Sequence, residues 1–203
     1  MKPTPTLLCI PDISGFTRFM HDVDIEVSSQ VIPSLLNKII YSNTLQLKVS
    51  EIEGDAVLFY RTGELPNFLD LVQQCKNFYT EFYTQMEVLL DKFRKKHSQI
   101  DFPEILGLKI ILHYGPEIGM VQIGNRIKLM GEDVITAHRL LKNDIPINEY
   151  LLVSEQLLAQ YDTEKINGNF DWASVKKGVL KEADLGNLPY RYLDLKPLKK
   201  QES

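Results

Sequence analysis

Residues 7–17 of the chain read Leu-Leu-Cys-Ile-Pro-Asp-Ile-Ser-Gly-Phe-Thr, and this stretch decides the fold. Its first four residues are apolar, are too few for a helix and show no helical period, so they predict a buried β-strand. Asp12 stands at the end of that strand, and we expect Ile13 to Thr17 to form a turn that opens a helix. The free backbone N–H groups of such a turn can bind phosphate oxygens.

A second acidic residue follows the next turn signal. Residues 44–52 and 56–60 resemble strands and flank Glu53-Gly54, so they predict a β-hairpin, and Asp55 begins its second strand. If that strand lies beside the first one, the carboxylates of Asp12 and Asp55 meet at one edge of the sheet. Two such carboxylates suit Mg²⁺ or Mn²⁺ held together with substrate phosphates. The alternative for the two aspartates is a helix cap and a hairpin residue.

Two segments have the apolar spacing of helices, residues 27–41, which contain Pro33, and residues 66–96. The second segment follows the 4-3 spacing that is also typical of a coiled coil. Further apolar residues widen its stripe: Leu69, Leu71, Phe78 and Leu90. This width favours a helix packed on a sheet over a coiled coil. The basic residues 94–97 suit the C-terminal end of that helix.

The second half of the chain predicts mainly strands. The expected elements are a strand over 105–114 that stops at Gly115-Pro116, a strand pair over 119–130 with a turn at Gly124-Asn125, a helix over 131–141, a strand over 150–153, a short helix capped by Ser154, and two or three strands that end at 190–195. This order predicts an α+β fold with a mostly antiparallel sheet and helices on one face. We expect a single domain over 1–203, with its core in 5–195 and a frayed polar tail in 196–203.

Composition excludes several classes of function. The chain has 203 residues with 23 basic and 27 acidic side chains, a net charge of −4, which argues against nucleic acid as a partner. No apolar run is long enough to cross a bilayer, and the N-terminus lacks the layout of a signal peptide, so we expect no membrane association. Cys9 and Cys75 lie in apolar stretches and read as core residues, which fits a reducing cytoplasm.

Three motifs, in this order, resemble those of class III nucleotidyl cyclases, the catalytic domain of adenylyl and guanylyl cyclases. They are Asp-Ile-Ser-Gly-Phe-Thr at 12–17, Glu-Ile-Glu-Gly-Asp-Ala at 51–56, and Gly-Glu-Asp-Val-Ile-Thr-Ala-His-Arg-Leu at 131–140. The resemblance covers most of residues 5–195. It implies a ferredoxin-like core with helices packed on a mostly antiparallel sheet, which agrees with the α+β order of elements.

The resemblance also implies roles for individual residues. Asp12 and Asp55 occupy its two metal-ligand positions, for Mg²⁺ or Mn²⁺. Glu51 and Lys128 occupy the positions that select the base. Glutamate at the first is typical of the guanylyl type, because a carboxylate can accept hydrogen bonds from guanine, whereas lysine at the second is unusual. The alternative for Glu51 and Lys128 is that they are exposed charges on strands and pair with each other. The nucleotide-binding residues are then Ile13, Ser14, Gly15, Phe16, Thr17, Glu51 and Lys128.

The transition-state residues of the family are only partly present. Arg139 matches the catalytic arginine that steadies the triphosphate, and its forked donors suit phosphate. Ile135 stands where the family has the asparagine that positions the ribose. Leu185, before Gly186, stands where the family has a lysine, and Lys181 is near enough in sequence to substitute for it.

Three functions are consistent with these residues. The first is metal-dependent binding of a purine nucleoside triphosphate, with conversion to a cyclic nucleotide and pyrophosphate. The resemblance then implies a head-to-tail homodimer, in which the aspartates come from one chain and Glu51, Lys128 and Arg139 from the other. The second is a catalytically inactive nucleotide-binding or dimerising regulatory module. The third is a metal-dependent phosphohydrolase that uses the same two aspartates.

Overall fold

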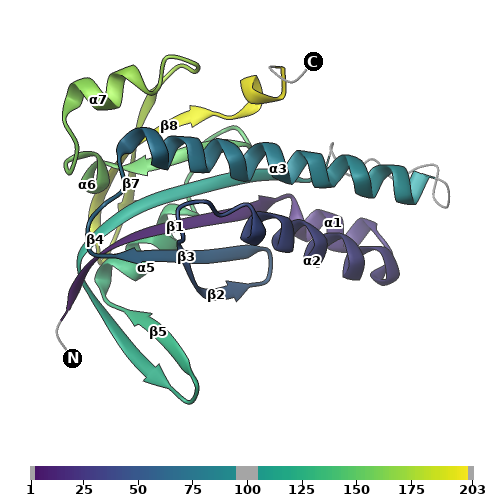
Figure 1. Cartoon of the computed structure of the whole chain (residues 1–203), viewed down its shortest axis with the longest axis horizontal. Helices are drawn as coiled ribbons and strands as arrows, with labels where there is room; N and C mark the ends of the chain where they lie inside the picture. Colours follow the sequence, from purple (N-terminus) through teal and green to yellow (C-terminus); the bar gives the residue numbers. More distant parts are fainter. Residues whose placement is uncertain (1–2, 95–104, 201–203) are drawn as a thin grey trace.

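The structure is a computed structural model that describes residues 3–94 and 105–200 (Figure 1). Its elements follow in the order β1 (Thr4–Ser14), α1 (Phe16–Asp22), α2 (Ile25–Tyr41), β2 (Lys48–Glu53), β3 (Ala56–Thr62), α3 (Phe68–Arg94), β4 (Gly107–Ile123), β5 (Arg126–Met130), α5 (Glu132–Leu140), β6 (Tyr150–Ser154), α6 (Glu155–Leu158), α7 (Thr163–Gly168), β7 (Lys176–Glu182), β8 (Gly186–Asp194) and the 3₁₀ helix η1 (Lys196–Lys200). The part of the predicted basic helix end at 95–97 lies outside the described residues.

One mixed sheet organises the fold. Its strands run in the order β2-β3-β1-β4-β6-β8-β7, and β5 pairs with β4 outside this path. Only β4 and β6 are parallel, and every other pairing between these strands is antiparallel. The predicted α+β fold with a mostly antiparallel sheet is therefore confirmed, and β1, the strand predicted from residues 7–10, lies inside the sheet between β3 and β4.

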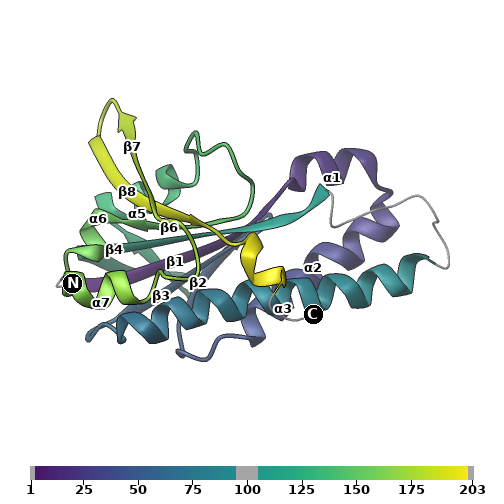
Figure 2. The same cartoon turned by 90° about the horizontal axis from the view of Figure 1, so that it is seen from above.

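Helices cover both faces of the sheet. Leu7 and Cys9 of β1 belong to the core beneath α2 and α3, whereas Leu8 and Ile10 belong to the core beneath α5 (Figure 2). Because both faces of β1 are buried, its apolar residues run without alternation. The expectation of helices on one face was wrong, since α5 packs on the face opposite α2 and α3.

The long helix α3 packs along the sheet as predicted, and it contributes to the core from Phe68 to Phe93. Phe78 stacks on Phe59 of β3 with ring centroids 5.3 Å apart, which fixes the helix to the sheet. Leu69 was expected in the buried stripe but is 60% exposed. Within the described residues, no helix combines the length and the apolar character needed to cross a membrane.

The strand β4 extends beyond its predicted stop. It continues through Gly115-Pro116 to Ile123 and then forms a hairpin with β5 that projects from the sheet in Figure 1. The predicted stop was wrong because Pro116 falls opposite an irregularity in β1, between Thr4 and Thr6, where the register shifts. A proline, which has no N–H to donate, is tolerated at such a place. The predicted turn at Gly124 is confirmed, with φ +60°.

The segment expected to fray, residues 196–203, is ordered as far as it is described. η1 is held to the core by Leu198, which is buried, and by Lys199, whose Nζ lies 3.1 Å from Oε1 of Glu149. The Glu149 carboxylate is itself buried and also accepts hydrogen bonds from the hydroxyls of Tyr79 and Tyr83 on α3. The sequence missed this anchor because its partners are separated by up to about half the chain.

Candidate functional site

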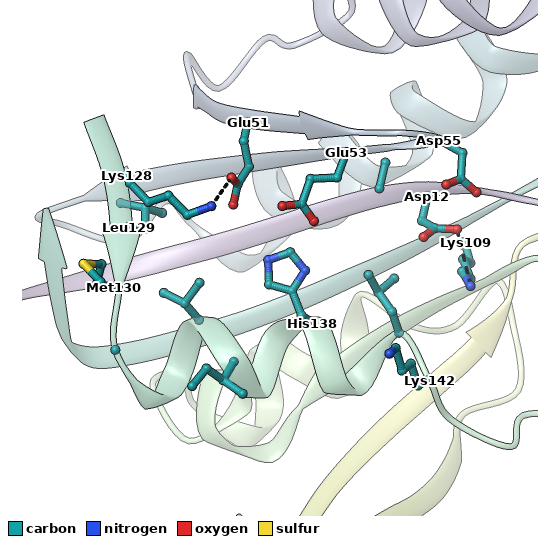
Figure 3. Close-up of a pocket in the computed structure, with 15 residues that line it drawn as sticks. Asp12, Glu51, Glu53, Asp55, Lys109, Lys128, Leu129, Met130, His138 and Lys142 are labelled. Carbon is teal, nitrogen blue, oxygen red and sulfur yellow. Dashed lines mark hydrogen bonds and ion pairs between the residues drawn. The ribbon is translucent and has the colours of Figure 1, made fainter. Parts of the chain in front are cut away.

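The antiparallel pairing of β1 and β3 brings Asp12 and Asp55 together. Asp12 pairs with Ala56 across the two strands, and the N–H of Ile13 donates a 3.0 Å hydrogen bond to the backbone carbonyl of Asp55. The two side chains project into one cleft (Figure 3). Gly54, at φ +60°, makes the turn before Asp55 and takes a left-handed conformation that suits glycine. The local sequence therefore places two carboxylates side by side, as expected.

The electrostatics of the two carboxylates show that they interact. Burial, and then the negative charge of Asp12, raise the pKa of Asp55 to about 6. Burial also raises the pKa of Asp12, and the nearby Lys109 partly offsets this rise. Nζ of Lys109 lies 3.3 Å from Oδ1 of Asp12, and both side chains are mostly buried. The two carboxylates therefore repel each other, and the positive charge of Lys109 offsets part of this repulsion.

Lys109 was not predicted as a site residue. It pairs directly with Asp12 across β1 and β4. The available signal was a single lysine inside the apolar run 105–112, because a charge in a buried strand needs a partner. The sequence did not say which partner, since the register of β1 on β4 joins residues about a hundred positions apart.

The donor set fits a hard divalent cation. Asp12 and Asp55 supply carboxylate oxygens, and among the described residues no group of three or more histidine, cysteine or acidic side chains is arranged to hold a metal. Mg²⁺ and Mn²⁺ accept such a two-carboxylate site, because waters and substrate phosphates complete their coordination. The raised pKa of Asp55 agrees with this chemistry, since a bound cation would relieve the repulsion from Asp12.

The turn after Asp12 differs from the expected phosphate cradle at its first two residues. The side chain of Ile13 is buried in the core and its N–H is already bonded to Asp55. Ser14 still belongs to β1, and its hydroxyl donates a 2.6 Å hydrogen bond to the carbonyl of Asn148. Gly15 has φ +81°, and a Cβ there would lie 1.9 Å from the carbonyl oxygen of Ile105, so only glycine fits. Ile13 and Ser14 therefore build the turn, and its later N–H groups, up to Thr17, are those left for phosphate.

A cleft of about 800 Å³ runs between the β2–β3 hairpin and α5. Figure 3 shows Asp12, Asp55 and Lys109 at one end of it and Glu51 with Lys128 at the other. Nζ of Lys128 lies 2.7 Å from Oε2 of Glu51, so the two expected base-selecting residues form an ion pair within one chain. This pair raises the pKa of Lys128. The cleft floor is apolar, with Ala56, Leu129, Met130, Val134, Ile135 and Leu141.

The helix α5 directs its residues to different places. Ile135, which is 54% exposed, lines the cleft together with His138. Arg139 does not line it; its Nε lies 3.8 Å from Oε2 of Glu182 on β7. Leu185 lies in the turn between β7 and β8, and Lys181 lies on β7 opposite Asn187. Within one chain, the structure therefore directs Arg139 to Glu182 and places His138 in the cleft, opposite Glu53 in Figure 3.

Comparison with known proteins identifies a family. The sequence matches the family described as "Protein of unknown function (DUF2652)" over residues 32–150, more than half of the chain. It is also 29% identical over 111 residues to "Uncharacterized protein Rv2561/Rv2562" of Mycobacterium tuberculosis, a match that covers 54% of this chain and 50% of that protein. The chain thus matches about half the length of this relative.

Solved structures with a similar fold are cyclase catalytic domains. The catalytic core of a rhodopsin-guanylyl cyclase with converted specificity, in complex with ATPαS, is 14% identical, with a TM-score of 0.62 over 95% of this chain and 97% of that one. The adenylyl cyclase CyaB from P. aeruginosa is 16% identical, with a TM-score of 0.60 over 95% and 94%. The guanylate cyclase domain of RhGC from Catenaria anguillulae, in complex with GTP, is 14% identical, with a TM-score of 0.60 over 95% and 97%. At these identities the likeness shows the fold, which agrees with the resemblance of the three motifs.

Proposed function

Because this chain belongs to the DUF2652 family and has the fold of adenylyl and guanylyl cyclase catalytic domains, we propose that it binds a purine nucleoside triphosphate with Mg²⁺ or Mn²⁺. The observation that carries the proposal is the pair of carboxylates, Asp12 and Asp55, at one end of the cleft, with Lys109 beside them. The fold neighbours add support, since two of them were solved in complex with ATPαS and with GTP.

Each residue at the end of the cleft with Asp12 and Asp55 has a distinct role in the proposal. Asp12 and Asp55 hold the cation, which when bound neutralises charge on the phosphates and on the leaving pyrophosphate. Lys109 offsets part of the rise that burial causes in the pKa of Asp12, and it offers its ammonium to phosphate oxygens once the cation shares Asp12. Gly15, Phe16 and Thr17 direct their backbone N–H groups to the same phosphates. Glu51 and Lys128, which the resemblance assigned to the second chain, line the other end of the same cleft, and we assign the purine to them there.

The proposed turnover uses two copies of the chain. Ile135 and Arg139 lie one helical turn apart on α5, and both are exposed. Arg139 points away from the aspartates of its own chain, so we assign it to the site of a second copy in a head-to-tail homodimer with twofold symmetry. In that site the 3′-hydroxyl gives up its proton to water and attacks the α-phosphorus, the bond from this phosphorus to the oxygen that bridges to the β-phosphate breaks, and a cyclic nucleotide and pyrophosphate form.

A catalytically inactive nucleotide-binding or dimerising regulatory module is the second candidate. Ile135 lines the cleft with a side chain that neither donates nor accepts a hydrogen bond, and Leu185 brings no charge to the β7–β8 turn. Arg139 is paired with Glu182. Losing one transition-state contact typically costs a factor on the order of 10²–10³ in rate, so two losses favour binding without turnover.

The test separates binding from turnover. The chain is incubated with each of the four ribonucleoside triphosphates and Mn²⁺, the products are identified by mass, and the melting temperature is recorded with and without ligand. We expect GTP or ATP with Mn²⁺ to raise the melting temperature of wild type, by an amount that grows with ligand concentration. Asp55→Asn should abolish the ligand-dependent rise, and Asp171→Asn, at an exposed position outside the cleft, should keep it.

The products then decide between the candidates. A cyclic nucleotide with pyrophosphate supports the cyclase, and a ligand-dependent rise without any product supports the inactive module. Release of a nucleoside diphosphate or monophosphate would support a phosphohydrolase that uses the same two aspartates. No ligand-dependent rise with any nucleotide and Mn²⁺ would refute the proposed nucleotide site altogether.

A further inference from the structure

Two basic residues that line the cleft have no role in the homodimeric site proposed above. His138 and Lys142, on α5 and directly after it, line the same cleft as Asp12 and Asp55. In Figure 3 the His138 ring projects from α5 towards the sheet, and Lys142 lies below Lys109. Arg139, the neighbour of His138 and the residue expected to bind phosphate, faces Glu182 instead.

Helix geometry and the pairing of Arg139 with Glu182 together explain this division. Successive residues of an α-helix are turned by about 100°, so positions three or four apart share a face. Val134, His138 and Leu141 follow this spacing and line the cleft. Ile135 also lines the cleft, but Arg139, one turn after it, extends its side chain to Glu182 on β7 and does not line the cleft. A ligand held by the aspartates of one chain therefore shares its cleft with His138 of the same chain, whereas Arg139 reaches that ligand only from a second copy.

The pairing of the cleft charges points to the same two residues. Nζ of Lys109 lies 3.3 Å from Asp12, and Nζ of Lys128 lies 2.7 Å from Glu51, so each already has a carboxylate partner. Among the described residues, no carboxylate lies within 4.0 Å of the basic nitrogens of His138 or Lys142. Their N–H donors are therefore available to an anion that enters the cleft.

We propose that a single copy of the chain binds the phosphate chain of its ligand, which lies between a divalent cation at Asp12 and Asp55 and the N–H donors of His138 and Lys142. This inference rests on the proposed function, because it places the same ligand in the same cleft. It adds that binding precedes dimerisation and is complete within one chain. Any turnover then waits for Arg139 of a second copy.

The charge balance of the cleft supports binding within one chain. Four acidic residues, Asp12, Glu51, Glu53 and Asp55, line it, and three lysines oppose them. Without a cation the carboxylates exceed the lysines, so a polyphosphate is repelled. A divalent cation reverses this balance, and the two unpaired basic residues then attract the phosphates. Binding of the anion should therefore require the metal.

The experiment uses tripolyphosphate as the probe, with Mn²⁺, in isothermal titration calorimetry. It compares wild type with His138→Gln and Lys142→Gln, after sedimentation has identified a concentration at which the chain is monomeric. Matched controls are His21→Gln and Lys165→Gln, whose side chains are 87% and 68% exposed and lie outside the cleft. We expect one tripolyphosphate per monomer, an affinity about tenfold lower in each cleft variant, and unchanged affinity in both controls.

The outcomes separate this inference from the proposed function. If wild type binds and Asp55→Asn abolishes binding, but His138→Gln and Lys142→Gln bind like wild type, the inference is overturned and the metal-phosphate site stands. It is also overturned if Arg139→Gln weakens binding and the cleft variants do not, or if binding appears only at concentrations that form dimers. If wild type does not bind tripolyphosphate with Mn²⁺, both the inference and the proposed site fail.

Discussion

Replacing Asp55 with asparagine should make the chain more stable at neutral pH. Burial and the adjacent negative charge of Asp12 raise the pKa of Asp55 from 3.8 to about 6. Because the folded chain binds this proton more tightly than the unfolded chain, the ionised carboxylate destabilises the folded state. The penalty is complete above pH 6 and disappears as the pH falls from 6 towards 4. Asparagine keeps the shape of the side chain and removes the charge.

The magnitude follows from the size of the pKa change. A tenfold change in proton affinity corresponds to about 1.4 kcal/mol, so the rise from 3.8 to about 6 sets an upper limit of about 3 kcal/mol. Asp55 is partly exposed, and solvent screens its charge, so we expect a gain of about 1.5 kcal/mol. For a chain of this length that gain raises the melting temperature by roughly 3–6 °C.

The assay is thermal unfolding of wild type and Asp55→Asn at about pH 8 and at about pH 4, without divalent cations. The gain should be present at the higher pH and nearly absent at the lower one, where Asp55 is protonated in wild type. Asp171→Asn should change neither value. A variant that is destabilised at the higher pH, or that gains equally at both, would refute the electrostatic reasoning. Mn²⁺ should stabilise wild type and leave Asp55→Asn unaffected.

Three further predictions concern other contacts. Lys109→Met should lower the free energy of unfolding by about 1–2 kcal/mol, because Asp12 loses its mostly buried cation, and Mn²⁺ should restore part of this loss in thermal unfolding. Lys199→Met should cost about 2 kcal/mol in urea unfolding, because the buried carboxylate of Glu149 loses its nearer cation and keeps Lys196, whose Nζ lies 4.0 Å away, whereas Lys165→Met should cost less than about 0.5 kcal/mol. The β4–β5 hairpin projects from the sheet with Ile123, Ile127 and Met130 exposed, and we expect it to form the dimer contact, so Ile127→Glu, at a 44% exposed position, should shift the chain to monomer in sedimentation; an unchanged dimer would exclude this contact.

The sequence predicted those parts of the site that depend on short-range signals. The apolar run 7–10 with Asp12 after it, and the Glu53-Gly54 turn with Asp55 after it, each define a strand end and a carboxylate within a few residues. Antiparallel pairing of the two strands then leaves few ways to keep the carboxylates apart. Their juxtaposition was therefore predictable once the two strands were taken to be neighbours, the one long-range assumption that it needed.

The parts that the sequence missed depend on register between distant strands. Lys109 becomes a partner of Asp12 only through the pairing of β1 with β4. Pro116 reads as a strand end by local rules, and only the register shift in β1 opposite it allows β4 to continue. Similarly, no local signal says that Arg139 faces Glu182 rather than the cleft, because Glu182 belongs to a strand that follows about forty residues later.

The anchoring of η1 has a consequence for how the protein is made. A ribosome adds residues from the N-terminus, so Tyr83 and Glu149 leave it well before Lys199. Until then the nascent chain cannot give the Glu149 carboxylate its cation, and burying an unpaired charge is unfavourable. The contact between α3 and the start of β6 should therefore close late in synthesis, and a chain released early would leave this part of its interior open to chaperones and proteases.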